Sequence, residues 1–131
     1  MRHPYGKGSK AERELLKKFW ENKVAAIRVA GSGRATTPAC DIIAGKNKRI
    51  AVFECKATKK NSIYLEEDEL HKLDTLARVM GCRAFIACRF SRDEWFFVPL
   101  GKAEEVKKIR REDCKKSWAL SFPKLLEYFY K

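Results

Sequence analysis

The sequence predicts a mixed α/β fold in which a central β-sheet is flanked by helices. Apolar residues recur at helical spacing in two segments, residues 9–23 and 66–80. Short apolar runs that are typical of strands lie between these segments and after the second one. The element order is therefore helix, three strands, helix, two strands. A chain of 131 residues is long enough for one core but not for two, so we expect a single domain over residues 1–131.

The first helix is predicted to begin at Ser9, because Ser9-Lys10-Ala11-Glu12 matches a capping box. In this motif the serine hydroxyl accepts a hydrogen bond from the N3 amide, and the N3 glutamate accepts one from the cap amide. The helix is predicted to end at Asn22 and Lys23. Its inward-facing stripe consists of Leu15, Leu16, Phe19 and Trp20.

The next segment is predicted to contain three strands. Residues 24–29 form a short apolar run, and residues 30–38 are small and polar, as is typical of a loop. Residues 41–44 and 49–56 are predicted to form a hairpin joined by a turn at residues 45–48. The second strand of this hairpin is apolar enough to be central in the sheet.

The second half begins with the clearest helix, residues 66–80, which Gly81 is predicted to terminate. Strands are expected at residues 83–90 and 94–98. The tail beyond Pro99 is less regular, and residues 103–111 are compatible with a helix.

A last helix is expected to be capped by Ser121. Its apolar stripe consists of Phe122, Leu125, Leu126 and Phe129. From the sequence alone this stripe is either core or a surface that contacts a partner.

The charge balance favours a polyanionic partner. The chain has 29 Lys and Arg against 17 Asp and Glu, a net charge of +12. Nucleic acid is the first expectation, ahead of an acidic membrane surface or an acidic protein. No run approaches the roughly 18 apolar residues that span a bilayer, and no signal peptide is recognisable at the N-terminus. We therefore expect a cytoplasmic protein, associated with the nucleoid if the partner is DNA, and no membrane.

The cysteines predict neither a zinc site nor a disulfide framework. They are odd in number, lie far apart and include no CxxC pair. The expectation is buried free thiols. The five are Cys40, Cys55, Cys82, Cys88 and Cys114.

Asp41, Glu54 and Lys56 are the residues with the greatest catalytic potential. Glu54 and Lys56 lie two apart on one predicted strand, so they point to the same side, and Asp41 opens the partner strand. Two adjacent carboxylates need a cation, and oxygen ligands suit Mg²⁺ or Mn²⁺. With a lysine that holds water or meets charge on phosphorus, this set suffices for phosphodiester hydrolysis. The alternative is a simple Glu–Lys pair on an exposed strand face.

Three further residues have both a structural and a functional interpretation. Glu12 has a structural role in the capping box, but a helix end that faces the hairpin would also aim it at the metal. Ser32 and Arg34 lie in a glycine-containing loop, which is either a plain flexible turn or a contact to phosphate oxygens.

Four blocks of the sequence resemble the archaeal Holliday junction resolvases, which belong to the restriction-endonuclease-like PD-(D/E)-x-K nucleases. The resemblance extends from about residue 7 to about residue 90. The blocks are Gly8-Ser9-Lys10-Ala11-Glu12-Arg13-Glu14-Leu15, Arg28-Val29-Ala30-Gly31-Ser32-Gly33, Asp41-Ile42-Ile43-Ala44 and Glu54-Cys55-Lys56. One departure is that the usual Pro-Asp pair is Pro38-Ala39-Cys40-Asp41 here.

The resemblance implies a restriction-endonuclease-like fold and a homodimer that cuts four-way DNA junctions with symmetric paired nicks and Mg²⁺. The implied catalytic residues are Glu12, Asp41, Glu54 and Lys56. The implied metal ligands are Glu12, Asp41, Glu54 and the backbone carbonyl of Cys55. Arg13 and Arg28 match basic residues near the site, and Ser32 matches a mobile loop that reaches the DNA backbone. The remaining alternatives are a related nuclease that acts on duplex or flap DNA, and a non-catalytic nucleic-acid-binding module.

Overall fold

A computed structural model describes residues 6–31 and 36–131. The α-helices are α1 (Gly6–Glu21), α2 (Glu67–Met80), α3 (Leu100–Val106) and α4 (Phe122–Tyr130), and η2 (Arg111–Lys115) is a 3₁₀ turn. The strands are β1 (Ala25–Arg28), β2 (Ile42–Lys46), β3 (Arg49–Thr58), β4 (Ser62–Tyr64), β5 (Arg83–Phe90), β6 (Phe96–Pro99), β7 (Lys108–Arg110) and β8 (Leu120–Ser121).

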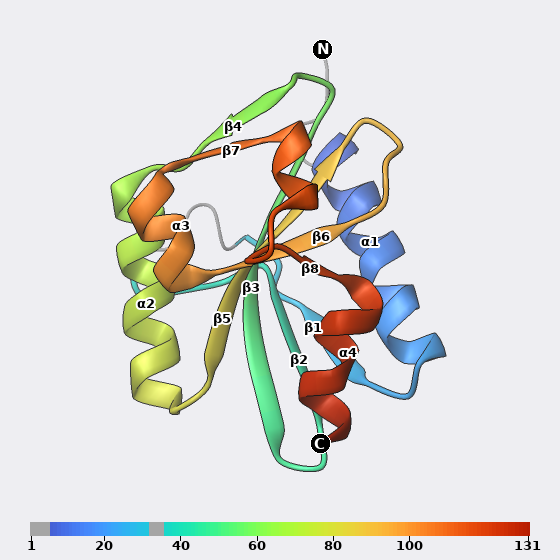
Figure 1. The fold of residues 1–131 in the computed structure, drawn as a ribbon. Helices are drawn as coiled ribbons and strands as arrows, with labels where there is room; N and C mark the ends of the chain where they lie inside the picture. The colour runs from blue at the N-terminus through green and yellow to red at the C-terminus, as the bar shows by residue number, and fades with distance from the viewer. Residues whose placement is uncertain (1–5, 32–35) are drawn as a thin grey trace.

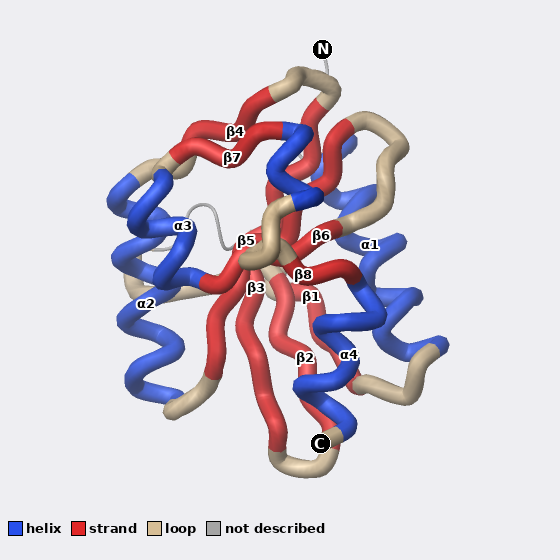
Figure 2. Tube along the Cα trace, viewed as in Figure 1, coloured by secondary structure: helices blue, strands red, loops and turns tan. Residues whose placement is uncertain are grey.

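The sheet is mixed and lies between two layers of helices, which confirms the predicted fold class. Its six strands have the order β1-β2-β3-β5-β6-β8, and β3 lies near the centre between β2 and β5. The β3–β5 pair is parallel and the other pairs are antiparallel. Helices α1 and α4 cover one face, and α2 and α3 cover the other (Figure 1). Strands β4 and β7 form a separate two-stranded ribbon (Figure 2).

The β2–β3 hairpin fixes the register of the candidate site. Ile42 is opposite Phe53, so Asp41, one residue before β2, is opposite Glu54. The turn consists of Asn47 and Lys48, whose φ angles are both positive, at 49° and 70°. The predicted turn was therefore two residues too long, because residues 45 and 46 still pair within the hairpin. Because the two strands end together at this turn, the longer strand β3 extends beyond the first residue of β2 at the opposite end of the hairpin.

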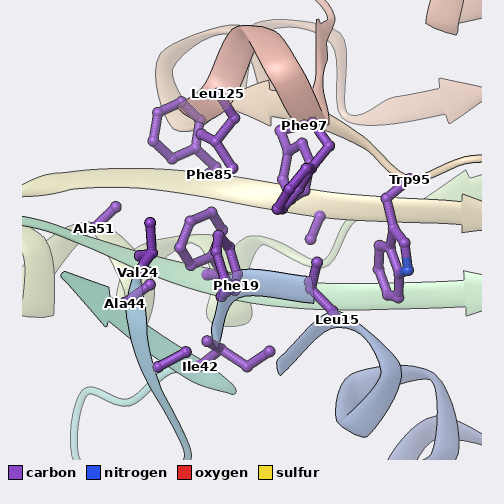
Figure 3. Packing of buried hydrophobic residues seen from close by; sticks show 14 of the residues in the cluster. Leu15, Phe19, Val24, Ile42, Ala44, Ala51, Phe85, Trp95, Phe97 and Leu125 are labelled. Atoms are coloured by element: carbon purple, nitrogen blue, oxygen red, sulfur yellow. The ribbon is translucent and has the colours of Figure 1, made fainter. Parts of the chain in front are cut away.

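The two faces of the sheet bury separate apolar clusters. On the α1 side, the Phe19 ring lies 5.4 Å from Phe53 and 5.5 Å from Phe122 between centroids, and Leu15 and Leu125 are fully buried beside them (Figure 3). The other cluster packs α2 against the opposite side of β3, β5 and β6. Because β3 is buried on both faces over residues 51–53, its next residues are held in a rigid frame.

The start of the first helix was predicted wrongly. Helix α1 begins at Gly6, so Ser9 lies inside it and is not its cap. The carboxylate of Glu12 accepts a hydrogen bond from Arg28 Nε at 2.8 Å instead. The capping-box pattern failed because the helix begins before Ser9, and Glu12 pairs with a charged side chain of β1.

The tail was predicted only in part. The segment 103–111 is not one helix, because α3 ends at Val106, Lys107 adopts a φ of 58°, and β7 follows. Strand β7 pairs with β4, which was not predicted. The last helix is confirmed: Ser121 Oγ accepts a hydrogen bond from the Lys124 amide at 3.3 Å. Its apolar stripe is core rather than a partner surface.

Of the predicted inward-facing stripe of the first helix, Leu15 and Phe19 are fully buried, but Trp20 was predicted wrongly. It is 57% exposed, because it lies at the edge of the sheet, where its indole Nε1 donates to the Ala26 carbonyl at 3.0 Å.

The remaining expectations from the sequence are largely confirmed. Helix α2 ends at Gly81, whose φ is 69°, and β5 has the predicted bounds. All five cysteines are free thiols; Cys40 and Cys88 are buried as expected, whereas Cys114 is exposed. Among the described residues, no helix is long and apolar enough to cross a membrane.

Candidate active site

Asp41 lies where β3 extends beyond its neighbour β2. Its backbone continues the sheet, because its amide donates to the Phe53 carbonyl at 2.8 Å and its carbonyl accepts from the Val29 amide at 2.8 Å. Its side chain takes the place of a backbone acceptor for the next part of β3, because Oδ2 accepts a hydrogen bond from the Cys55 amide at 2.8 Å. The carboxylate of Asp41 is thereby fixed beside the residues on either side of Cys55.

Glu54 faces Asp41 across the hairpin and is only 17% exposed. Burial and the neighbouring charge of Asp41 raise the pKa of Glu54 to about 8, and Lys56 only partly opposes this rise. A hydrogen bond between the Glu54 and Asp41 carboxyl groups is the smallest cause that raises the pKa of Glu54. Two acidic groups that resist simultaneous ionisation are a strong attractor for a cation.

Lys56 follows on the same face of β3 and lies between two carboxylates. Its Nζ is 3.8 Å from Glu54 Oε2 and donates to Glu69 Oε1 at 2.8 Å. Burial would lower the pKa of Lys56, but the hydrogen bond to Glu69 and the surrounding negative charges raise it above its ordinary value. Lys56 is therefore a charged ammonium, 25% exposed, at the edge of the acidic pair.

Glu12 approaches the same region from helix α1. Burial raises the pKa of Glu12, the hydrogen bond from Arg28 opposes this, and the charge of Asp41 adds to the rise. Arg13, the next residue, is exposed, and its charge also acts on Glu12. The structure thus brings Glu12, Arg13 and Arg28 to the Asp41 side of the site.

The donor set fits a divalent cation that prefers oxygen. The carboxylates of Asp41 and Glu54 meet, whereas Glu12 is held by Arg28, and no three Asp, Glu, His or Cys side chains of the described residues form a ready-made metal cluster. Burial raises the pKa of the Cys55 thiol well above its ordinary value, so Cys55 is a neutral thiol and not a thiolate ligand. The only atom of Cys55 that suits an oxygen-preferring cation is therefore its backbone carbonyl oxygen.

One residue of this arrangement was not predicted from the sequence. Glu69 was predicted only as part of a helix, because no local pattern shows that α2 brings its first turn to β3. Ser32 and Arg34 lie outside the described residues.

Comparisons with known proteins point to one family. A family model described as "Archaeal holliday junction resolvase (hjc)" matches residues 3–128. The crossover junction endodeoxyribonuclease Hjc of Archaeoglobus fulgidus is 40% identical over 78% of this chain and 75% of its own length. The enzyme of the same name from Methanocaldococcus jannaschii is 34% identical over 76% of this chain and 71% of its own length.

A solved structure of Archaeoglobus fulgidus Hjc, described as a Holliday junction resolvase from an archaeal hyperthermophile, superposes with a TM-score of 0.79. It is 33% identical, and the match covers 89% of this chain and 98% of the other. With a family match along nearly the whole chain, and Asp41, Glu54 and Lys56 together at the end of the β2–β3 hairpin, the chain belongs to the archaeal Holliday junction resolvase family.

Proposed function

We propose that this chain is a divalent-metal-dependent endonuclease that resolves four-way DNA junctions in recombination and repair. The observation that carries the proposal is the meeting of two carboxylates, Asp41 and Glu54, with the ammonium of Lys56 on a rigid central strand. Membership of the resolvase family supports the substrate and the reaction. We propose Mg²⁺ as the metal, with Mn²⁺ as a substitute.

The chemistry follows from the roles that each side chain is able to perform. When bound, a divalent cation supplies positive charge to phosphodiester oxygens and acidifies water. Asp41 and Glu54 are proposed to hold it, with the backbone carbonyl of Cys55 and the carboxylate of Glu12 as further ligands. The Lys56 ammonium is proposed to orient the attacking water and to stabilise charge that develops on the phosphate.

Cations around the site are proposed to hold the DNA backbone. Arg13 is exposed beside Glu12, and Arg28 lies on β1 next to the strand that leads from Asp41. Ser32 and Arg34 are proposed to add contacts from the segment before Asp41. Contacts of this kind fix position and affinity, while the branched shape of the junction provides the discrimination.

Symmetric cleavage requires two sites, so we propose that the active form is a homodimer. A junction has two equivalent strands to cut, and a two-fold pair of chains presents two equivalent sites. The expected mass in sedimentation equilibrium is twice that of the chain. Mixed dimers of wild type and a cleavage-dead variant should nick one strand of each junction; complete, paired cutting by mixed dimers would contradict the assignment of one site to each chain.

The test of the function is cleavage of a synthetic immobile junction, with a linear duplex of the same sequence as the control. With Mg²⁺ we expect paired nicks at symmetric positions on opposing strands, and with excess EDTA no nicks. Preferential cutting of the linear duplex would indicate a related nuclease of the same superfamily. Junction binding with no cutting in any divalent cation would leave only a nucleic-acid-binding module.

A further inference from the structure

We propose that Glu69 is the positioning residue for Lys56: it holds the ammonium away from Glu54 and leaves that carboxylate available to the cation. This inference rests on the proposed nuclease function. It is carried by the contacts of Lys56, which lies closer to Glu69 than to the carboxylate on its own strand. The distances from Nζ are 2.8 Å to Glu69 Oε1 and 3.8 Å to Glu54 Oε2.

Glu69 differs from the other acids in the first turn of α2. Glu67 pairs with Lys107 and is 80% exposed, and Asp68 pairs with Lys72 and is 76% exposed. Glu69 is 35% exposed and is directed at the sheet, where it meets Lys56. Because side chains on a helix change direction by about 100° per residue, only one acid of this turn faces β3. Acidic residues are generally favoured at a helix N-terminus, but Glu67 and Asp68 already satisfy that preference. It therefore does not explain why Glu69 points at the sheet.

The role of Glu69 follows from the competition for Lys56. Glu54 and Lys56 lie two apart on one face of β3, so a lysine without another partner would lie against Glu54. That pairing would neutralise a carboxylate that the cation needs, and it would remove the ammonium from its place beside the attacking water. The strong hydrogen bond to Glu69 prevents both effects at once.

The first experiment compares single-turnover cleavage of a four-way junction by wild type, Glu69→Ala, Glu69→Gln and the matched control Asp68→Ala. Loss of a residue that orients a catalytic group typically costs about 10- to 100-fold, so we expect that loss in Glu69→Ala and less than about twofold in Asp68→Ala. Glu69→Gln retains an oxygen acceptor for Lys56 and is expected to restore most of the rate. The dissociation constant for the junction should not rise in any variant.

The second experiment has a readout other than cleavage. Calorimetric titration with Mn²⁺ compares Lys56→Ala with the double variant Lys56→Ala/Glu69→Ala. If Glu69 acts through Lys56, the two affinities differ by less than about tenfold, and any residual difference comes from the Glu69 charge that acts on Glu54. A loss of about tenfold or more in the double variant would make Glu69 a metal ligand and overturn the proposal.

Other outcomes also have a definite meaning. Unchanged cleavage by a folded Glu69→Ala, or an equal loss in Glu69→Gln and Glu69→Ala, would overturn the role of the hydrogen bond. Failure of the wild-type protein to cut the junction would instead reject the proposed function. The two failures are therefore distinguishable in the same assay.

Discussion

Asp41 has two tasks that are separable by substitution. Its Oδ2 accepts a hydrogen bond from the Cys55 amide and so completes the pairing of β3 beyond the end of β2. Its charge opposes the ionisation of Glu54 and so raises the pKa of Glu54. A buried amide without its acceptor costs about 1–3 kcal/mol, so an alanine here would weaken the fold as well as the site. Asparagine retains an acceptor oxygen and removes only the charge.

We therefore expect Asp41→Asn to fold, to bind the junction and to lose cleavage. The metal contributes several kcal/mol to charge stabilisation in the transition state, so losing one of its carboxylates should reduce the single-turnover rate by about 100-fold or more. Gel-shift binding without divalent cations should be at least as tight as that of wild type, because a negative charge near phosphate has been removed. Normal cutting by Asp41→Asn would show that the site is misassigned.

Glu54 predicts an unusual dependence of stability on pH in the metal-free protein. Its pKa is raised from 4.5 in the unfolded chain to about 8 in the fold. Between these values the folded state holds a proton that the unfolded state has lost, so the free energy of unfolding falls as pH rises. This contribution is fully present below pH 4.5 and is lost as pH rises through about 8.

We accordingly expect Glu54→Gln to unfold at a higher temperature than wild type at pH 8.5 in EDTA, and at nearly the same temperature at pH 5. The difference should be on the order of a few kcal/mol at the higher pH. Thermal melts followed by circular dichroism at both pH values provide the measurement. If the unfolding temperatures of wild type and Glu54→Gln differ by the same amount at both pH values, Glu54 does not titrate in this range.

At the scale of elements, the β2–β3 hairpin sets the register that brings Asp41 opposite Glu54. Its turn places Lys48 at a φ of 70°, in a region that is costly for residues other than glycine. Two-residue turns with both φ angles positive favour Asn-Gly. Lys48→Gly should therefore raise the free energy of unfolding by about 0.5–1 kcal/mol, measured as a higher urea midpoint at unchanged m-value. The control Lys59→Gly, which lacks a positive φ, should show no gain.

Helix α4 tests the assignment of the C-terminal stripe to the core. Leu125 is fully buried against the α1 side of the sheet, whereas Leu126 on the same helix is only half-buried. Leu125→Ala is expected to cost about 2–5 kcal/mol in unfolding free energy, and Leu126→Ala clearly less. Equal, small costs measured by urea unfolding would place the stripe on a surface instead.

The elements predicted well are those whose signals are local. Helix α2 and strand β5 carry complete periodic patterns, and Gly81 terminates α2 as its residue type demands. Ser9-x-x-Glu12 is also a local pattern, but the partner that takes Glu12 is Arg28, on another element. Strands β4 and β7 are three residues each and exist through pairing of residues 62–64 with 108–110, for which the sequence provides no local signal.

The same distinction applies to the site. Glu54 and Lys56 were predictable because strand periodicity puts them on one face, and Asp41 was predictable at the start of the adjoining strand. Its position opposite Glu54 was not predictable, because the four-residue turn expected from the sequence pairs residue 41 with residue 52. Glu69 was not predictable, since its position depends on how α2, which lies in the crossover from β3 to the parallel strand β5, packs against β3. The roles that the family resemblance assigns to Glu12 and to the Cys55 carbonyl stay predictions.

At the scale of the whole molecule, the net charge of +12 is the property that decides how the protein meets DNA. Each phosphate neutralised releases condensed counterions, so the logarithm of the dissociation constant should rise with the logarithm of salt by about 0.9 per contact. A surface that makes about six contacts would lose roughly 1,000-fold in junction affinity between about 50 and 200 mM salt. Cations close to the carboxylates should account for this slope, and distant ones should not.

Fluorescence anisotropy with a labelled junction in EDTA, across a series of salt concentrations, tests this in wild type and two variants. Arg13→Ala removes an exposed cation beside Glu12 and should reduce the slope by about one. Lys48→Gly removes a cation at the far end of β3, about 20 Å from Glu54 at roughly 3.3 Å per residue, and should leave the slope unchanged. A flat salt response in wild type, or the same slope for all three proteins, would contradict a backbone-contacting surface centred on the carboxylates.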